Sequence, residues 1–266
     1  MNPIALIIVR LMDTLLLGRA DGVVTVTMSR PRKNAITVEM ENELIDVLRE
    51  VAARREDRVL VLTGADGEFC SGADLSDPGT LTDDGLFYMR RVGEMILDLH
   101  QLPKPTIAKV PGVAAGLGCN VALACDLIVA ADTARFSEIF ARRGLALDCG
   151  GSWLLPRRVG LHKAKELAFF ADVLSASEAQ EMGLINRVIP AGELDKVVDE
   201  WASRLAAGPP LALSMIKSQL DAGLSSSLEE ALEREAVSQS VNFTTADTAE
   251  AMTAFLEKRE PRFTGR

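Results

Sequence analysis

Two segments rich in small residues carry the groups of this sequence that are best suited to chemistry. They cover residues 67–75 (GEFCSGADL) and residues 112–120 (GVAAGLGCN), and each follows a predicted strand. Around Ser71 and Ala73 the small side chains leave the main chain uncovered, so a ligand can approach backbone N–H groups closely. Gly116 lies where a helix is predicted to begin, and the first N–H groups of a helix have no partner within it. If the two segments converge, their N–H groups can bind one ligand oxygen.

Two such N–H groups aimed at a thioester oxygen form an oxyanion hole. Electrostatic stabilisation of this kind is worth about 3–4 kcal/mol for each donor. It suits a reaction that passes through an enolate. The alternative interpretation of the same glycines is a pair of tight turns with close helix packing, and glycine content by itself does not separate the two.

The cysteines and histidines predict neither a metal site nor thiol chemistry. None of the four cysteines forms a CxxC pair, and two histidines cannot supply a His-rich metal site. A thiol nucleophile needs a base or a positive neighbour, and His100 and His162 lie in segments with no reason to meet the cysteines. We therefore expect a reduced, cytoplasmic setting in which the thiols are packing residues. The four are Cys70, Cys119, Cys125 and Cys149.

Composition and charge narrow the class of protein. A chain of 266 residues with 48% hydrophobic and 25% charged residues can bury one substantial core and carry a smaller attached element. The net charge of -9 argues against nucleic acid or an anionic membrane as the main partner. Arg10 and Asp13 interrupt the apolar start, which is a poor signal peptide and too short to span a bilayer. We expect the fold to begin near Met12, with residues 1–11 as an upstream extension.

Strands and helices alternate through the first half of the chain. Residues 22–28 are β-branched and alternate, which predicts a strand. From Thr37 to Val51 apolar residues recur at helical spacing, with Glu41 among the charged residues assigned to the other face. Residues 58–63 form a short apolar run typical of a strand buried on both sides. The same criteria predict a loop over residues 64–84, a helix around 89–99, strands at 106–110 and 127–130, and small-residue packing over 112–124.

Beyond Ala191 the pattern is helical. Ser227 with Glu230, and Asp247 with Glu250, resemble capping boxes, in which side chains satisfy the free N–H groups of a first turn. Alternating strands and helices followed by helices alone predict an α/β fold with a helical C-terminal region. The apolar residues of that region need a surface to pack on, either the main domain or another subunit.

Six motifs in order make the chain similar to the crotonase superfamily, also called the enoyl-CoA hydratase/isomerase family. The resemblance extends from about Met12 to Phe263, and its pattern is closest to phenylacetate-pathway-type enoyl-CoA isomerases. Each motif alone is weak, whereas the order and spacing together are specific. The motifs are RPRKNA (30–35), FCSGADL (69–75), PGVAAG (111–116), ACDL (124–127), GGSWLLPR (150–157) and EKREPRF (257–263).

The resemblance implies a fold, a substrate and an assembly. The fold is a spiral of ββα units with a C-terminal helical oligomerisation region, which divides the chain into residues 12–200 and 201–266. The substrate is an acyl-CoA thioester, so coenzyme A enters with the substrate and no separate cofactor is expected. The assembly is a homotrimer or a dimer of trimers.

The resemblance also places the site residues. The two oxyanion donors fall on the backbone N–H groups of Ala73 and Leu117. In the family, the coenzyme arm passes the RPxxxNA turn, and a Lys and a Phe of the C-terminal helix come near the adenine, sometimes across a subunit boundary. The substrate-binding residues are therefore Lys33, Asn34, Ala35, Ser71, Asp74, Leu75, Phe140, Lys258 and Phe263.

The choice of reaction depends on which acids the site contains. A typical hydratase of the family holds its water with two glutamates, and here those positions are Asn120 and Phe140, neither of which can act as a carboxylate base. Glu138 is two residues from the second position and is not taken as a substitute. Asp148 matches the acid/base aspartate of some family isomerases, and one carboxylate can move a proton between two carbons of an enolate. The alternatives are that Asp148 only caps the next helix, and that Asn120 orients a thioester or water or only makes a local hydrogen bond.

Four functions remain open from the sequence. The leading hypothesis is an enoyl-CoA isomerase with Asp148 as the proton shuttle. The second is an enoyl-CoA hydratase or another crotonase reaction that tolerates Asn120. The third is an acyl-CoA-binding protein without catalysis, and the fourth is a scaffold subunit.

Overall fold

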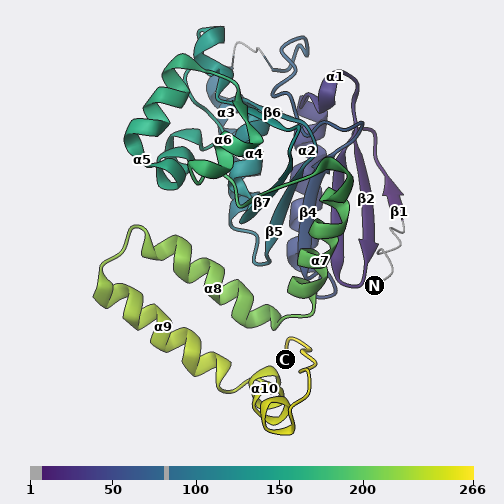
Figure 1. Cartoon of the computed structure of the whole chain (residues 1–266), viewed down its shortest axis with the longest axis vertical. Helices are drawn as coiled ribbons and strands as arrows, with labels where there is room; N and C mark the ends of the chain where they lie inside the picture. Colours follow the sequence, from purple (N-terminus) through teal and green to yellow (C-terminus); the bar gives the residue numbers. More distant parts are fainter. Residues whose placement is uncertain (1–7, 81–83) are drawn as a thin grey trace.

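A seven-stranded sheet forms the centre of the structure, a computed structural model that describes residues 8–80 and 84–266 (Figure 1). The strand order is β1-β2-β3-β4-β5-β7-β10. The first two pairings are antiparallel, and from β3 onward every pairing is parallel. The strands are β1 (Ile8–Leu11), β2 (Leu15–Ala20), β3 (Val23–Met28), β4 (Val59–Gly64), β5 (Thr106–Val110), β7 (Leu127–Ala131) and β10 (Arg187–Ile189).

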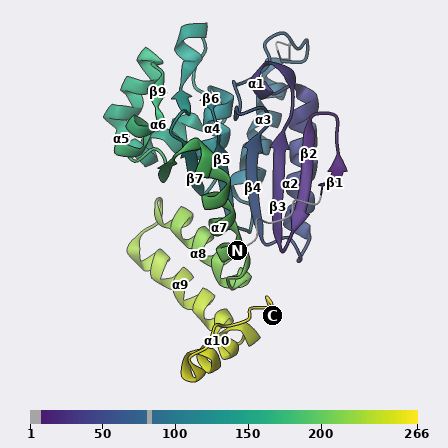
Figure 2. The same ribbon diagram turned by 45° about the vertical axis from the view of Figure 1, so that its right-hand side comes forward.

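Helices cover both faces of this sheet, which is why central strands such as β4 and β7 are mainly apolar. On one face, α2 (Val38–Ala53), α3 (Gly85–His100) and α4 (Leu117–Ala124) share a core with residues such as Val26 and Leu60. On the other face, α7 (Leu194–Ala206) packs against Val61 and its neighbours (Figure 2).

A second layer lies beside the main sheet. A three-stranded sheet of order β6-β8-β9 consists of β6 (Val113–Ala115), β8 (Arg135–Ser137) and β9 (Leu174–Ser175). The short helix α1 (Pro31–Asn34) follows β3, and the 3-10 helix η1 (Ile139–Arg143) follows β8. The helices α5 (Gly151–Phe170) and α6 (Ala176–Glu181) complete the layer, and η2 (Ala191–Glu193) leads into α7. The expected spiral of strands and helices is confirmed.

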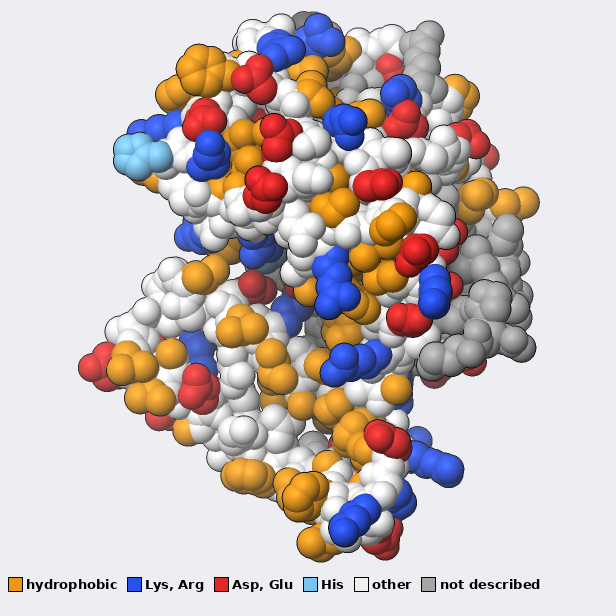
Figure 3. All heavy atoms as spheres, viewed as in Figure 1, with side chains coloured by type: hydrophobic (Ala, Val, Ile, Leu, Met, Phe, Trp, Pro, Cys, Tyr) orange, Lys and Arg blue, Asp and Glu red, His pale blue; other side chains and the backbone are white. Residues whose placement is uncertain are grey.

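The C-terminal helices extend away from this body. They are α8 (Pro210–Gly223), α9 (Leu228–Asn242) and α10 (Ala246–Glu257), and α8 and α9 bury no residue fully. The capping box that the sequence predicts at Ser227 and Glu230 is present at the start of α9. Figure 3 shows apolar side chains over these helices, and the exposed ones include Leu220, Phe243 and Phe255. Exposed apolar surface of this extent is typical of an interaction surface.

The start of the fold differs from the sequence prediction. β1 pairs with β2 through Arg10 and Leu11, so the sheet already includes residues upstream of Met12. Residues 1–7 of the expected extension lie outside the described residues. At the other boundary, α7 begins at Leu194 and runs past position 200, and it packs on the main sheet.

Two predictions about side chains are wrong. Glu41 is fully buried, not on a polar face. It lies four residues before Ile45 and therefore shares the buried face of α2. Asp247 does not cap α10, because the N-cap is Thr245. The carboxylate of Asp247 instead accepts hydrogen bonds from backbone N–H groups at residues 264 and 265, which anchors the C-terminal tail.

Among the described residues, none of the helices combines the length and the apolar character that crossing a bilayer requires. In the same part of the chain, no cluster of three His, Cys, Asp or Glu side chains could hold a metal ion.

Candidate active site

A cavity of about 250 Å³ lies between the segment that follows β4, the start of α4, the first turns of α3, and η1. Both predicted donor residues, Ala73 and Leu117, line it, and so does Asp148. Ser71, Leu75, Tyr88 and Phe140 also line it.

The two glycine-rich segments run side by side at this cavity. The N–H group of Cys70 donates to the carbonyl oxygen of Val113 at 2.8 Å, and the N–H group of Ala115 donates to the carbonyl oxygen of Cys70 at 3.0 Å. Cys70 and Ala114 thus form a parallel bridge between the segment after β4 and strand β6. The convergence that the sequence analysis required is present.

Two glycines allow this close approach. A Cβ atom on Gly118 would lie 2.3 Å from the carbonyl oxygen of Cys70, which is far inside van der Waals contact. Gly116 has φ 52° and ψ -124°, a combination that residues other than glycine avoid. This backbone conformation directs the chain into α4. The glycines therefore do serve close packing, which was the alternative interpretation of the sequence. The same packing also brings the two donor segments together.

The amides of Ala73 and Leu117 are the free donors at this junction. Among the described residues, neither N–H group donates a hydrogen bond to the protein. Leu117 is the first residue of α4, where the helix dipole adds partial positive charge. A Cβ atom on Gly72 would lie 3.9 Å from the nitrogen of Leu117, so the two donor segments are in contact.

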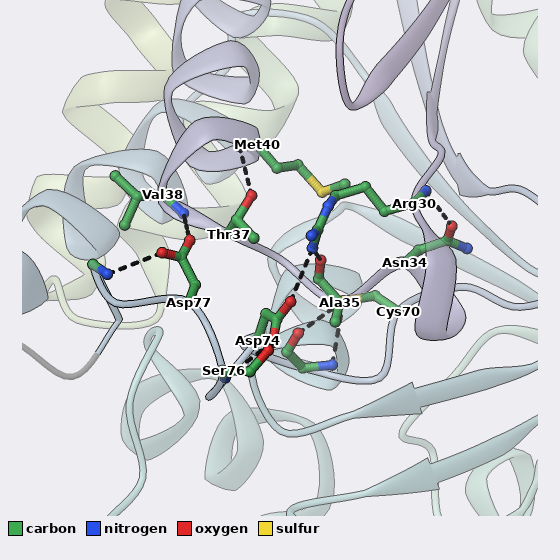
Figure 4. A network of polar contacts seen from close by, with 12 residues as sticks. Arg30, Asn34, Ala35, Thr37, Val38, Met40, Cys70, Asp74, Ser76 and Asp77 are labelled. Carbon is green, nitrogen blue, oxygen red and sulfur yellow. Dashed lines mark hydrogen bonds and ion pairs between the residues drawn. The ribbon is translucent and has the colours of Figure 1, made fainter.

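The RPRKNA turn braces the first donor segment (Figure 4). The guanidinium of Arg30 donates to the carbonyl oxygen of Ala35 at 2.7 Å and forms an ion pair with Asp74 at 3.3 Å. Asp74 also accepts from the N–H and hydroxyl groups of Ser76. Ile36 forms a parallel bridge with Ala73, which fixes the main chain at the donor.

The residues predicted to lie along the coenzyme arm, Lys33, Asn34 and Ala35, occupy this turn. Their side chains differ in exposure to solvent. The side chain of Asn34 is buried and donates to the carbonyl oxygens of Ala65 and Glu68, both at 3.0 Å, so it holds the turn. Lys33 is exposed, and its ammonium group lies 2.8 Å from the carboxylate of Glu68. Ala35 is buried. Of the three, only Lys33 has an exposed side chain.

Asp148 brings a carboxylate to the cavity. Its Oδ1 atom is buried and has no hydrogen-bond partner among the described residues. Burial raises the pKa of Asp148 because the charged form loses its water, and a hydrogen bond with Cys149 opposes this shift. A desolvated carboxylate with a raised pKa is a better base than one in water.

Asn120 does not line the cavity. It is fully buried, and its amide nitrogen donates to the backbone oxygen of Asp148 at 3.0 Å and to Glu138 at 3.4 Å. Glu138 is buried as well, and burial raises its pKa to about 7. Sequence reasoning set Glu138 aside, and the structure places it behind Asp148 rather than in the cavity.

Sequence analysis did not identify the polar pair Tyr88 and Glu41 at the cavity. The hydroxyl of Tyr88, which lines the cavity, donates to Glu41 Oε1 at 2.7 Å. Burial raises the pKa of Glu41 to about 6, while the Tyr88 hydrogen bond and Arg91 lower it. The signal was available, because Tyr88 lies four residues before the buried Val92 on α3 and therefore shares its face.

The remaining sequence-predicted residues lie elsewhere. All four cysteines are buried and free, and burial raises the pKa of Cys70 to about 12, which agrees with packing rather than nucleophilic roles. Lys258 follows α10, and the backbone oxygen of Phe263 accepts from Arg58, which precedes β4. In Figure 1, α10 and the C-terminus lie below the sheet, whereas α3 and β6, near the donor segments, lie toward its upper end. Within one chain, Lys258 and Phe263 do not reach the site.

Known proteins share this sequence and fold. The profile of the family described as enoyl-CoA hydratase/isomerase matches residues 18–266. The chain is 41% identical over 249 residues to a "Probable enoyl-CoA hydratase" of Rhodobacter capsulatus, covering 93% of this chain and 96% of that one. It is 38% identical over 262 residues to the 1,2-epoxyphenylacetyl-CoA isomerase of Escherichia coli, covering 96% and 100%. The crystal structure of an enoyl-CoA hydratase from Bacillus anthracis superposes with a TM-score of 0.92 at 30% identity, covering 96% and 100%.

Proposed function

Because the chain belongs to the enoyl-CoA hydratase/isomerase family, we propose that it moves the double bond of an enoyl-CoA thioester, with Asp148 as acid and base. One observation carries the choice of reaction. Asp148 is the only carboxylate among the described residues that line the cavity. A double-bond shift needs one such group, whereas the usual hydration of this family uses two.

The proposed reaction has two proton transfers. The amides of Ala73 and Leu117 hold the thioester oxygen, and Asp148 removes a proton from C2 of a 3-enoyl thioester. The C–H electrons form the enolate, whose negative charge the two amides stabilise. Asp148 then returns the proton to C4, so the double bond moves from C3–C4 to C2–C3. The raised pKa of Asp148 favours the first step, in which the carboxylate is the base, and in the second step the strongly basic dienolate takes the proton back.

Hydration is the second candidate, and a relative supports it. The relative at 41% identity is named as a hydratase, while that at 38% is named as an isomerase. Against hydration, Asn120 is buried behind the cavity and Phe140 lines it, so neither hydratase glutamate position offers a carboxylate.

We propose that Ser71, Leu75 and Phe140 contact the acyl group, since all three line the cavity. Lys33, exposed on the turn beside the first donor segment, is proposed to meet the coenzyme arm. Asn34, Ala35 and Asp74 support that turn and act through it. Coenzyme A enters with the substrate, and we propose no other cofactor.

A homotrimer or a dimer of trimers is the proposed assembly. The exposed apolar residues of α8, α9 and α10 support it, because such a surface favours burial against another subunit. Lys258 and Phe263, which lie far from the site of their own chain, are proposed to serve a neighbouring subunit's coenzyme (Figure 1). A cytoplasmic setting is part of the proposal and is supported by four free cysteines.

Matched enoyl-CoA isomers test the reaction. The 2-enoyl and 3-enoyl thioesters of one acyl chain are incubated with the protein in D2O, and double-bond migration, water addition and deuterium at C2 and C4 are followed by NMR. We expect migration, and an Asp148→Asn loss of roughly 10²- to 10⁴-fold in kcat. Asp46→Asn, an exposed change on α2, is the matched control. Dominant water addition, or full activity of Asp148→Asn, would reject the isomerase; tight binding without turnover or exchange would favour a non-catalytic binder.

A further inference from the structure

The Tyr88–Glu41 pair is a polar feature of the cavity that the proposed proton transfers do not use. Tyr88 lies in the first turns of α3 and lines the cavity, and Glu41 lies behind it on α2. The hydroxyl-to-carboxylate distance is 2.7 Å. The cavity lining is mainly apolar, with Thr80 and Arg143 among its polar members. Its apolar lining residues include Leu75, Met89, Val92, Phe140 and Leu145.

Packing alone does not account for this pair. Glu41 is fully buried, and its Oε2 atom has no hydrogen-bond partner among the described residues. A buried carboxylate is costly unless it is well partnered, and a Phe–Leu pair would join α2 to α3 without that cost. A buried polar pair on the wall of a ligand cavity is costly to the fold, and this indicates that the pair serves ligand binding.

The hydroxyl of Tyr88 can serve a ligand oxygen in either proton state of Glu41. When Glu41 is charged, Tyr88 donates to it, and the phenol oxygen can accept from a ligand hydroxyl in place of the hydroxyl of Thr80, which also lines the cavity. When Glu41 is protonated, it can donate to the phenol oxygen, and the Tyr88 O–H is free to point into the cavity. The charged groups that act on Glu41 are Arg91, which favours its ionised form, and Asp77 and Asp148, which oppose it.

We propose that Tyr88, backed by Glu41, is a subsite for an oxygen atom on the acyl group, so that the preferred substrates are oxygen-bearing enoyl-CoA thioesters rather than plain hydrocarbons. The oxygen is a hydroxyl or carbonyl beyond the reacting carbons. Tyr88 is a specificity-determining residue, and Glu41 positions it. The inference rests on the proposed acyl-CoA site and adds the class of acyl group.

Binding of unreactive thioesters tests the subsite separately from catalysis. Hexanoyl-CoA and its 4-, 5- and 6-hydroxy derivatives are titrated by calorimetry into the full-length protein and into Tyr88→Phe. We expect at least one hydroxy derivative to bind roughly tenfold more tightly than hexanoyl-CoA, and Tyr88→Phe to abolish the difference while hexanoyl-CoA binding stays within about threefold. Phe87→Leu, at an exposed neighbour on α3 that does not line the cavity, is the matched control.

Two further variants separate loss of the subsite from loss of folding and test the role of Glu41. Tyr88→Phe strands a buried carboxylate, so Tyr88→Phe with Glu41→Gln is titrated beside it to separate loss of the subsite from loss of folding. Glu41→Gln alone should keep a preference but remove its change with pH near the pKa of about 6. Equal binding of all four thioesters, or a preference that survives Tyr88→Phe, would overturn the subsite. Failure of hexanoyl-CoA itself to bind would overturn the acyl-CoA site and the subsite together.

Discussion

The side-chain amide of Asn120 donates a hydrogen bond of 3.0 Å to the backbone carbonyl oxygen of Asp148. This contact ties the loop that carries the proposed acid/base to helix α4, whose first amide is a proposed oxyanion donor. The fit is tight, because a Cβ atom on Gly151 would lie 2.6 Å from the amide nitrogen of Asn120. We therefore propose that Asn120, at the position where hydratases of the family carry a glutamate, sets the distance between the proposed acid and the proposed oxyanion hole.

Removing the Asn120 amide should affect both stability and turnover. Asn120→Ala removes one of two hydrogen bonds to the carbonyl oxygen of Asp148, which keeps the N–H donor of Gly151 at 2.9 Å, so we expect the free energy of unfolding to fall by about 1 kcal/mol. We also expect kcat to fall while the Kd of a saturated acyl-CoA stays nearly constant, because the cavity lining is unchanged. Urea unfolding and steady-state kinetics measure the two effects. Gln101→Ala, at an exposed amide, is the control, and an unchanged kcat would contradict the positioning role.

The stability of the protein should depend on pH through Glu138. Burial raises its folded-state pKa from 4.5 to about 7, so the folded protein binds this proton more tightly than the unfolded chain. Stability from this group is fully present below the unfolded pKa and is lost as the pH rises through the folded pKa, a change on the order of 3 kcal/mol.

Glu138→Gln should remove that dependence, since its amide oxygen can still accept from Asn120. We expect the variant and the wild type to be similarly stable near about pH 5, and the variant to be the more stable near about pH 8. Denaturant midpoints across this range measure it, with the exposed Glu39→Gln as the control. A stability difference that is independent of pH would show that Glu138 does not titrate in this window.

The sequence predicted the backbone part of the site better than its acids. Glycine at positions 116 and 118 indicates close approach of two main-chain segments, because a side chain at either position would prevent it. The two donor segments lie together as expected. Glu41 and Glu138 are buried because of partners on other helices and loops, and no local pattern states which charged residue has such a partner. Only the helical spacing of Glu41 from Ile45 gave a hint. The positions of Lys258 and Phe263 depend on assembly, which a single chain does not display.

The oxyanion hole should be sensitive to a methyl group at Gly116. Its backbone angles of φ 52° and ψ -124° suit glycine, so Gly116→Ala must rotate the peptide that orients the Leu117 amide. We expect kcat to fall by roughly 10²- to 10³-fold, the effect of losing one oxyanion donor. Gly93→Ala is the matched control, because Gly93 lies inside α3 and a Cβ atom there meets nothing within 4 Å. Full activity of Gly116→Ala would remove Leu117 from the proposed site.

Assembly should depend on the apolar surface of the C-terminal helices. Phe255 and Leu256 on α10 are 80% and 79% exposed, and glutamate at both positions would place two charges in any interface that covers them. We expect the wild type to have a trimeric or hexameric mass by light scattering and the double variant to dissociate, since burying unpaired charge is strongly unfavourable. Leu11→Glu, at an exposed apolar residue of the edge strand β1, is the control. Because Lys258 is proposed to serve a neighbour's coenzyme, dissociation should also weaken acyl-CoA binding; a double variant that stays assembled would show that α10 faces solvent in the oligomer.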